Sequence, residues 1–69
     1  MYNLTIKRTT TGEEVYNQDF YNLGKAYNRM AEWCDEKSYT IEEAESGEGY
    51  TAGGYGYDYS IELTEVNED

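Results

Sequence analysis

The chain has 69 residues, 15 acidic and five basic, with a net charge of −10 and no histidine. A chain of this length forms a single domain, residues 1–69, with a small core. A lone cysteine, Cys34, excludes an intrachain disulfide, and the lack of histidine excludes a Cys/His zinc site. No apolar run approaches the ~20 residues of a membrane span, and the start of the chain lacks a secretion signal. We therefore expect a soluble protein of a reducing cytoplasm, with no membrane contact.

The first predicted element is a strand over residues 2–9. Its apolar side chains fall on alternate positions, namely Tyr2, Leu4 and Ile6. A turn ends at Gly12, and residues 13–17 are predicted to return as a short strand with Val15 on its inner face.

Residues 19–36 predict an amphipathic helix, because their apolar side chains recur at spacings of three and four. The apolar stripe consists of Phe20, Leu23, Ala26, Tyr27, Met30, Trp33 and Cys34. Asp19 or Asn17 would cap the N-terminus, and Lys37 suits the end where the helix dipole favours cations. Gly24 inside the helix indicates close contact with the sheet.

Residues 38–46 admit two interpretations. Tyr39 and Ile41 alternate with polar neighbours, as in a strand. Thr40 and Glu43 instead fit the capping box of a short helix. The clustered Tyr, Thr and Ile favour the strand.

The clearest predicted strand spans residues 57–66, where four apolar side chains share one face: Tyr57, Tyr59, Ile61 and Leu63. The elements predict an α+β fold, in which a small antiparallel sheet of three to four strands packs one face on the helix. The expected order is β-(β)-α-β-β. The expected core joins Leu4, Ile6, Ile41, Ile61 and Leu63 of the sheet to Phe20, Leu23, Met30 and Trp33 of the helix.

The stretch GEGYTAGGYGYDYS, residues 47–60, is rich in glycine and tyrosine. Its glycine spacing is not that of a dinucleotide site, and no lysine follows as in a P-loop. From residue 32 onward twelve acids face a single base, Lys37, so the chain offers no cationic groove for direct nucleic-acid binding.

The same composition is typical of antibody loops, in which tyrosine supplies contact area and glycine supplies adaptability. We therefore expect a hairpin whose tip presents Tyr50 and Tyr55 to a protein partner. The next two tyrosines, Tyr57 and Tyr59, are expected to begin the core strand.

Few residues of the chain are suited to catalysis. Histidine is absent, and Cys34 lies beside Trp33 on the apolar stripe, which indicates a buried, inert thiol. Neighbouring carboxylates on a strand point to opposite faces, so they form no acid/base dyad. The spacing of a calcium loop is also absent. We predict a protein that is not an enzyme and that uses no cofactor or metal.

The acidity has two interpretations: solubility alone, or recognition of a basic partner. In the second, carboxylates pair with the arginines and lysines that a partner uses to hold phosphate, and tyrosines add contact area. The predicted partner-binding residues are Glu42, Glu43, Glu45, Glu48, Tyr50, Tyr55, Asp58 and Glu62.

Very small size, strong acidity, many Tyr and Asn residues and one disulfide-free α+β domain resemble phage-encoded anti-CRISPR proteins and other DNA-mimic anti-defence proteins. The resemblance implies an inhibitor that acts in a bacterial host cell on a defence nuclease complex, such as a CRISPR effector. The alternative is a small, non-inhibitory interaction or assembly module, including a homodimer, whose acidity serves solubility.

Overall fold

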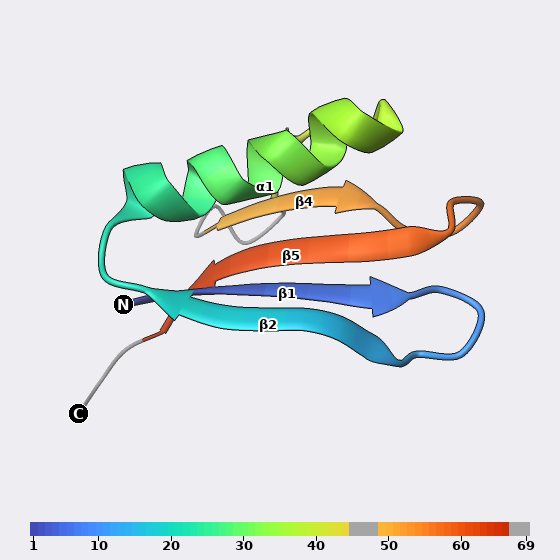
Figure 1. The fold of residues 1–69 in the computed structure, drawn as a ribbon, viewed down its shortest axis with the longest axis horizontal. Helices are drawn as coiled ribbons and strands as arrows, with labels where there is room; N and C mark the ends of the chain where they lie inside the picture. The colour runs from blue at the N-terminus through green and yellow to red at the C-terminus, as the bar shows by residue number, and fades with distance from the viewer. Residues whose placement is uncertain (45–48, 67–69) are drawn as a thin grey trace.

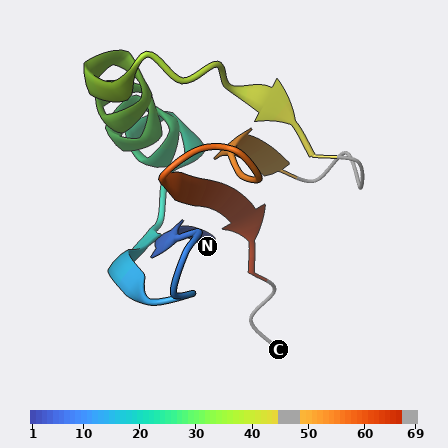
Figure 2. The ribbon, with the colours of Figure 1, turned by 90° about the vertical axis from the view of Figure 1, so that its right-hand side faces the viewer.

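A computed structural model describes residues 1–44 and 49–66 of the chain. The elements follow the order β1 (Tyr2–Arg8), β2 (Glu14–Phe20), α1 (Leu23–Lys37), β3 (Glu42–Glu43), β4 (Gly49–Gly53) and β5 (Tyr59–Glu65). Within the described residues the strands form one antiparallel sheet in the order β2-β1-β5-β4-β3, and α1 runs along it (Figure 1). Figure 2 shows α1 on one side of the sheet. The α+β class is as predicted, but the sheet has five strands rather than three or four.

The core lies between the helix and the middle of the sheet. In the register of β1 and β5, Leu4 pairs with Leu63 and Ile6 with Ile61, so four fully buried side chains meet on one face. The helix covers them with Ala26, Met30 and Cys34. Burial of each large side chain contributes roughly 1.5–3 kcal/mol, and this compact cluster is therefore the main stabilising element of a very small domain.

Three residues that were predicted to belong to the core are less buried than the central cluster. Ile41 and Trp33 are half-buried against the core cluster, Trp33 with its ring edge-on to that of Tyr59. Leu23 is 37% exposed, because it occupies the first helical position at the rim of the sheet. The prediction that Leu23 belongs to the core is therefore wrong.

The helix begins later than predicted. Asn22 is its N-cap, and the Asn22 side chain accepts a hydrogen bond from the Lys25 backbone N–H at 3.3 Å. Asp19 and Phe20 belong instead to β2, where they pair with β1. An added Cβ at Gly24 would meet the Asn22 side-chain oxygen at 3.0 Å, so the close neighbour of Gly24 is the cap and not the sheet. At the other end, Lys37 occupies the last turn as predicted.

The second strand, β2, is longer than predicted, and different side chains of it face the core. A bulge shifts the β1–β2 register between Ile6 and Lys7. Val15, expected on the inner face, is 36% exposed, whereas Tyr16 and Phe20 pack against the core. One extra residue in a bulge changes the face on which the flanking side chains lie, and the sequence alternation does not reveal it.

The segment after the helix contributes little regular structure. Residues 38–46 were predicted to form a strand. In the part of this segment that the structure describes, residues 38–44, pairing is limited to β3, with Glu42 opposite Thr51 and Glu43 opposite Tyr50. The Tyr39 backbone N–H donates to the Cys34 carbonyl at 2.8 Å, which closes the helix end instead of starting a strand.

Residues 49–53 of the glycine- and tyrosine-rich stretch form β4, which was predicted as loop. Gly49 lies against β5 so closely that an added Cβ would stand 2.1 Å from the Leu63 carbonyl oxygen. Gly53 has φ +70° and would also place a Cβ 2.1 Å from the Tyr59 carbonyl oxygen. The glycines therefore allow close strand contact and a tight hairpin, and the paired strand β5 begins at Tyr59 rather than at Tyr57.

Candidate protein-binding surface

Among the described residues, the one helix covers a single face of the sheet, and we call the other face the open face. Its position follows from the strand alternation, since Leu4 and Ile6 point to α1 and their neighbours point away. The residues that share the open face are Asn3, Thr5, Lys7, Glu14, Asn17, Asp19, Glu42, Thr51, Ser60, Glu62 and Thr64. All are polar, with four carboxylates and one ammonium group, so the open face is acidic.

A single row of paired residues crosses all five strands on the open face. In order from β2 to β3 it reads Asn17, Thr5, Glu62, Thr51 and Glu42. The two glutamates flank Thr51, so their backbones lie about 9.5 Å apart at the spacing of strands in a sheet. Glu42 and Glu62, two of the predicted partner-binding residues, lie on this one surface and are both exposed.

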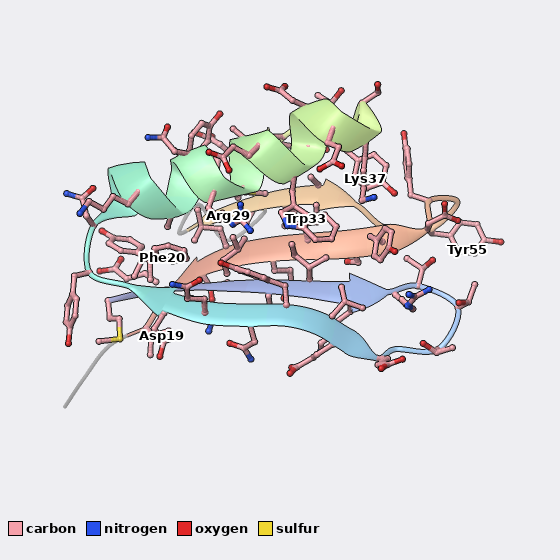
Figure 3. All side chains as sticks on the ribbon, in the orientation of Figure 1. Asp19, Phe20, Arg29, Trp33, Lys37 and Tyr55 are labelled. Atoms are coloured by element: carbon pink, nitrogen blue, oxygen red, sulfur yellow. The ribbon has the colours of Figure 1, made fainter. Side chains whose placement is uncertain are left out.

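The β1–β2 end of the open face is held by side-chain hydrogen bonds. The Asn3 amide donates to Asn17 Oδ1 at 2.8 Å and to Asp19 Oδ1 at 2.9 Å, and it accepts from the Thr5 hydroxyl at 2.5 Å. Figure 3 shows Asp19 and Phe20, neighbours in β2, on opposite sides of the sheet. The network fixes the Asp19 carboxylate on this face.

The side chain of Tyr55 is fully exposed to solvent. Tyr55 lies at the end of the β4–β5 hairpin with its side chain 105% exposed, and Figure 3 shows it directed away from the sheet. Asp58 is exposed in the same turn, where its backbone carbonyl accepts from the Thr9 N–H at 3.0 Å. The predicted exposure of Tyr55 at the hairpin tip is confirmed.

Tyr50 was predicted at the hairpin tip beside Tyr55, and this placement is wrong. It lies in β4 on the helix side, half-buried, with its ring edge-on to Tyr27 at 5.1 Å between centroids. Tyr57 was expected in the core strand, but it precedes β5 and is 53% exposed, with its ring edge-on to Tyr39. Tyr55 and Tyr57 are therefore the accessible rings of the hairpin.

The remaining predicted acids do not all join the open face. Glu43 pairs with Tyr50 and so points to the helix side, the face opposite to Glu42. Glu45 and Glu48 lie outside the described residues. Two open-face acids, Glu14 and Asp19, were missed because residues 14–20 were assigned to a short strand followed by a helix cap. The period of two through Tyr16, Gln18 and Phe20 was the available signal.

Three of the five basic side chains lie over aromatic rings of the helix side. Lys37 Nζ lies 5.0 Å from the Trp33 ring and 4.8 Å from the Tyr59 ring, and Arg8 lies 5.7 Å from Tyr59. Arg29 lies 5.4 Å from the Tyr16 ring. These contacts hold positive charge on the face opposite to the open face.

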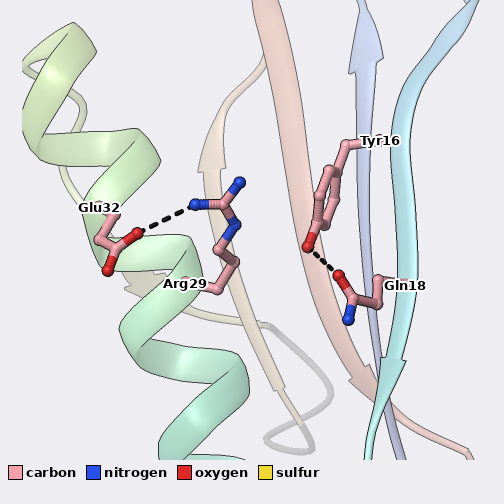
Figure 4. A network of polar contacts seen from close by, with 4 residues as sticks. All are labelled: Tyr16, Gln18, Arg29 and Glu32. Atoms are coloured by element: carbon pink, nitrogen blue, oxygen red, sulfur yellow. Dashed lines mark hydrogen bonds and ion pairs between the residues drawn. The ribbon is translucent and has the colours of Figure 1, made fainter.

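Arg29 also forms the one ion pair among the described residues, at 3.0 Å from the Glu32 carboxylate. Figure 4 shows this pair on α1, across from the hydrogen bond between the Tyr16 hydroxyl and the Gln18 side chain on β2. Tyr16 first, and Glu32 second, raise the pKa of the Arg29 guanidinium above its ordinary value. Arg29 therefore keeps its charge on the helix side.

The one thiol of the chain does not lie on the open face. Cys34 is a residue of α1 and is buried against the sheet. Burial raises the pKa of its thiol above the ordinary value, and the Asp35 charge adds to the effect. Residues 1–44 and 49–66 contain no group of three or more acidic or sulfur side chains suited to a metal ion. The described helix is also too short and too polar to cross a membrane.

The open face can thus offer carboxylates, hydroxyls and amides to a partner, with the exposed Tyr55 at one end. Comparison with protein families, curated proteins and solved structures gave no match to this chain. The case for function therefore rests on the geometry and charge of this surface.

Proposed function

We propose that the protein is an acidic, protein-binding inhibitor that lays its open face on a basic, nucleic-acid-binding surface of a partner. The observation that carries the proposal is the row across the sheet, in which Glu62 and Glu42 stand on either side of Thr51. A flat, polar, acidic face is suited to arginines and lysines whose ordinary ligand is phosphate.

The distribution of the cations supports the same orientation. Arg8, Arg29 and Lys37 lie over rings on the helix side, so they do not neutralise the open face. Lys7 is the one base on the open face, against four carboxylates. In addition, the exposed ring of Tyr55 lies at one end of the open face and is available to the partner. Tyrosine is enriched in protein interfaces relative to the rest of the surface.

The resemblance in overall character to anti-CRISPR and DNA-mimic proteins supports a defence nuclease complex of a bacterial host as the partner. Glutamates whose backbones lie about 9.5 Å apart do not copy the charge spacing of duplex DNA, which is one per ~1.7 Å of axis. The inhibitor would thus occupy the phosphate-binding side chains of the partner without reproducing the shape of DNA.

The test uses the protein immobilised and exposed to the heparin-binding fraction of a bacterial lysate. The variant Glu42→Lys/Glu62→Lys reverses the row on the open face, and Asp35→Lys/Glu36→Lys makes the same charge change on exposed positions of α1. We expect the wild type and the helix variant to capture a nucleic-acid-binding protein that duplex DNA displaces. The open-face variant should capture at least tenfold less, a difference of about 1.4 kcal/mol.

Capture should also fall steeply between low and moderate salt, because it depends on charge. Equal capture by both variants, or capture that salt and DNA leave unchanged, would contradict the proposal.

One observation favours the assembly module as a second candidate. The Val66 backbone N–H donates to the Met1 carbonyl, and the Thr9 backbone N–H donates to the Asp58 carbonyl. Backbone hydrogen bonds to β5 are therefore made by the odd-numbered residues of β1, and those to β2 by the even-numbered residues. By the antiparallel alternation, the backbone groups of Asn17 and Asp19 in β2 then point to the free edge of the sheet. A stable dimer in light scattering, with no basic protein captured, would support this candidate instead.

A further inference from the structure

A small hollow lies on the helix side, away from the open face. It has a volume of about 210 Å³ and is lined by Tyr2, Leu23, Glu43, Gly49, Tyr50, Leu63 and Glu65. Pockets for drug-sized ligands are larger, ~300–1,000 Å³. The hollow is therefore of a size suited to a single side chain.

The lining combines an apolar base with a charged rim. Leu63 is fully buried, and Leu23, at the start of α1, is partly exposed. The Tyr50 ring is held in place by its edge-on contact with Tyr27 at 5.1 Å. Glu43 and Glu65 are exposed, so their carboxylates supply negative charge beside these apolar and aromatic groups.

The two carboxylates have no cationic partner within the described residues, where the one ion pair joins Arg29 to Glu32. The remaining residues, 45–48 and 67–69, contain no Lys or Arg. Two of the other bases, Arg8 and Lys37, lie over Tyr59, and Lys7 is on the open face. Neither Lys25 nor the N-terminal amine forms an ion pair with a carboxylate of the described residues. Within the described residues, Glu43 and Glu65 are therefore available to pair with a cation of another molecule.

We propose that the hollow receives the guanidinium side chain of an arginine of the basic partner. The apolar stem would lie on Leu23 and Leu63, the guanidinium plane would lie against the Tyr50 ring, and its N–H groups would donate to Glu43 and Glu65. Arginine fits better than lysine, because its planar fork donates to two carboxylates and stacks on aromatic rings. The inference rests on the proposed function and adds a second contact, on the face opposite to the row.

The test titrates the protein with a blocked Gly-Arg-Gly peptide and follows the side-chain NMR signals of Leu23, Leu63 and Tyr50. We expect saturable shifts with a Kd on the order of 1 mM, as for a single exposed side chain. Glu43→Gln/Glu65→Gln should weaken binding about tenfold. The matched control Asp35→Asn/Glu36→Gln makes the same charge change at exposed positions near the C-terminal end of α1, away from the hollow, and should alter the Kd less than about twofold. Gly-Lys-Gly should bind more weakly, and Gly-Gln-Gly should cause no shift.

Equal weakening by both double variants would overturn the inference, because it would mean that general charge attracts the peptide. Shifts on the open face alone, or none at all, would overturn it as well. The proposed function fails separately: capture of a basic protein that depends on Glu42 and Glu62 can persist when the peptide does not bind the hollow. Conversely, peptide binding without any such capture would leave the hollow as an arginine site and refute the open face as the inhibitory surface.

Discussion

Two tyrosines of one hairpin should respond in opposite ways to truncation. Tyr55 is wholly exposed and contacts no packed surface, so Tyr55→Ala should change the free energy of unfolding by less than ~0.5 kcal/mol. Tyr50 is half-buried against the core and edge-on to Tyr27. Truncating a fully buried aromatic side chain costs ~3–5 kcal/mol, so about 2 kcal/mol is expected for Tyr50→Ala, including roughly 0.5–1.5 kcal/mol from the ring pair.

The assay is thermal and urea unfolding of the wild type and both variants, followed by circular dichroism. For a domain of this size each kcal/mol corresponds to roughly 4–8 °C, so Tyr50→Ala should lower the Tm by about 8–16 °C. A domain of 69 residues has a stability of ~3–10 kcal/mol, which leaves the variant mostly folded at low temperature.

Tyr55→Ala should leave the Tm unchanged and weaken the capture of the basic partner, because its ring is available to contact another protein. The variant Tyr55→Phe separates the ring from the hydroxyl group. A marked fall in Tm for Tyr55→Ala would refute the assignment of this ring to the interface. An unchanged Tm for Tyr50→Ala would refute its role in the helix-side packing.

Two further predictions concern the helix. Asn22→Ala removes the side-chain acceptor of the Lys25 N–H and should cost about 1 kcal/mol, whereas Asn22→Asp should keep most of the stability; a Tm for Asn22→Ala equal to that of the wild type would contradict the cap. Cys34 is 2% exposed and has a raised pKa, so its alkylation by iodoacetamide near pH 8 should be at least about tenfold slower than in urea. Because the pKa of Cys34 is raised in the folded state, the free energy of unfolding should fall as the pH rises above the ordinary thiol pKa and approaches the folded one. Cys34→Ala should lack this part of the decline. An identical decline in both proteins would contradict the burial of an un-ionised thiol.

The sequence predicts the central strands well, because their alternation is simple. Leu4, Ile6, Ile61 and Leu63 all lie in the core where the period of two places them. Met30 and the buried thiol of Cys34 were also predicted from the helical stripe. These positions are determined by local periodicity and by burial, and both are visible in one chain.

The elements at the edges were harder to predict for identifiable physical reasons. Phe20 has the spacing of the helix stripe and also the alternation of β2, and pairing with Tyr2 places it in the strand. β4 has glycine at both ends, so its composition is typical of a loop. Gly49 is nevertheless required by the close approach of the Leu63 carbonyl. This contact with β5 is a tertiary feature that the sequence of the segment does not show.

The candidate surface was predicted only in part, since it depends on strand register. Glu42 and Glu62 could be placed on one face from alternation alone, but β4 lies between them and carries Thr51 in the same row. Glu14 lies beyond the bulge of β2, so alternation along the strand does not place it on this face. Asp19 was missed because it was taken as a candidate cap of the helix and not as part of β2. Register and bulges are set by pairing between strands, so a sequence read strand by strand does not specify them.

The short strand β3 connects the two proposed contacts. Glu42 and Glu43 are neighbours in the chain, yet they point to opposite faces, which is why they cannot act as an acid dyad. The same geometry places one carboxylate in the row of the open face and the other at the rim of the hollow. A partner that contacts both carboxylates must reach both faces of β3. A concave, basic groove, of the kind that surrounds a nucleic-acid strand, can contact both faces, whereas a flat basic surface can engage only one of them.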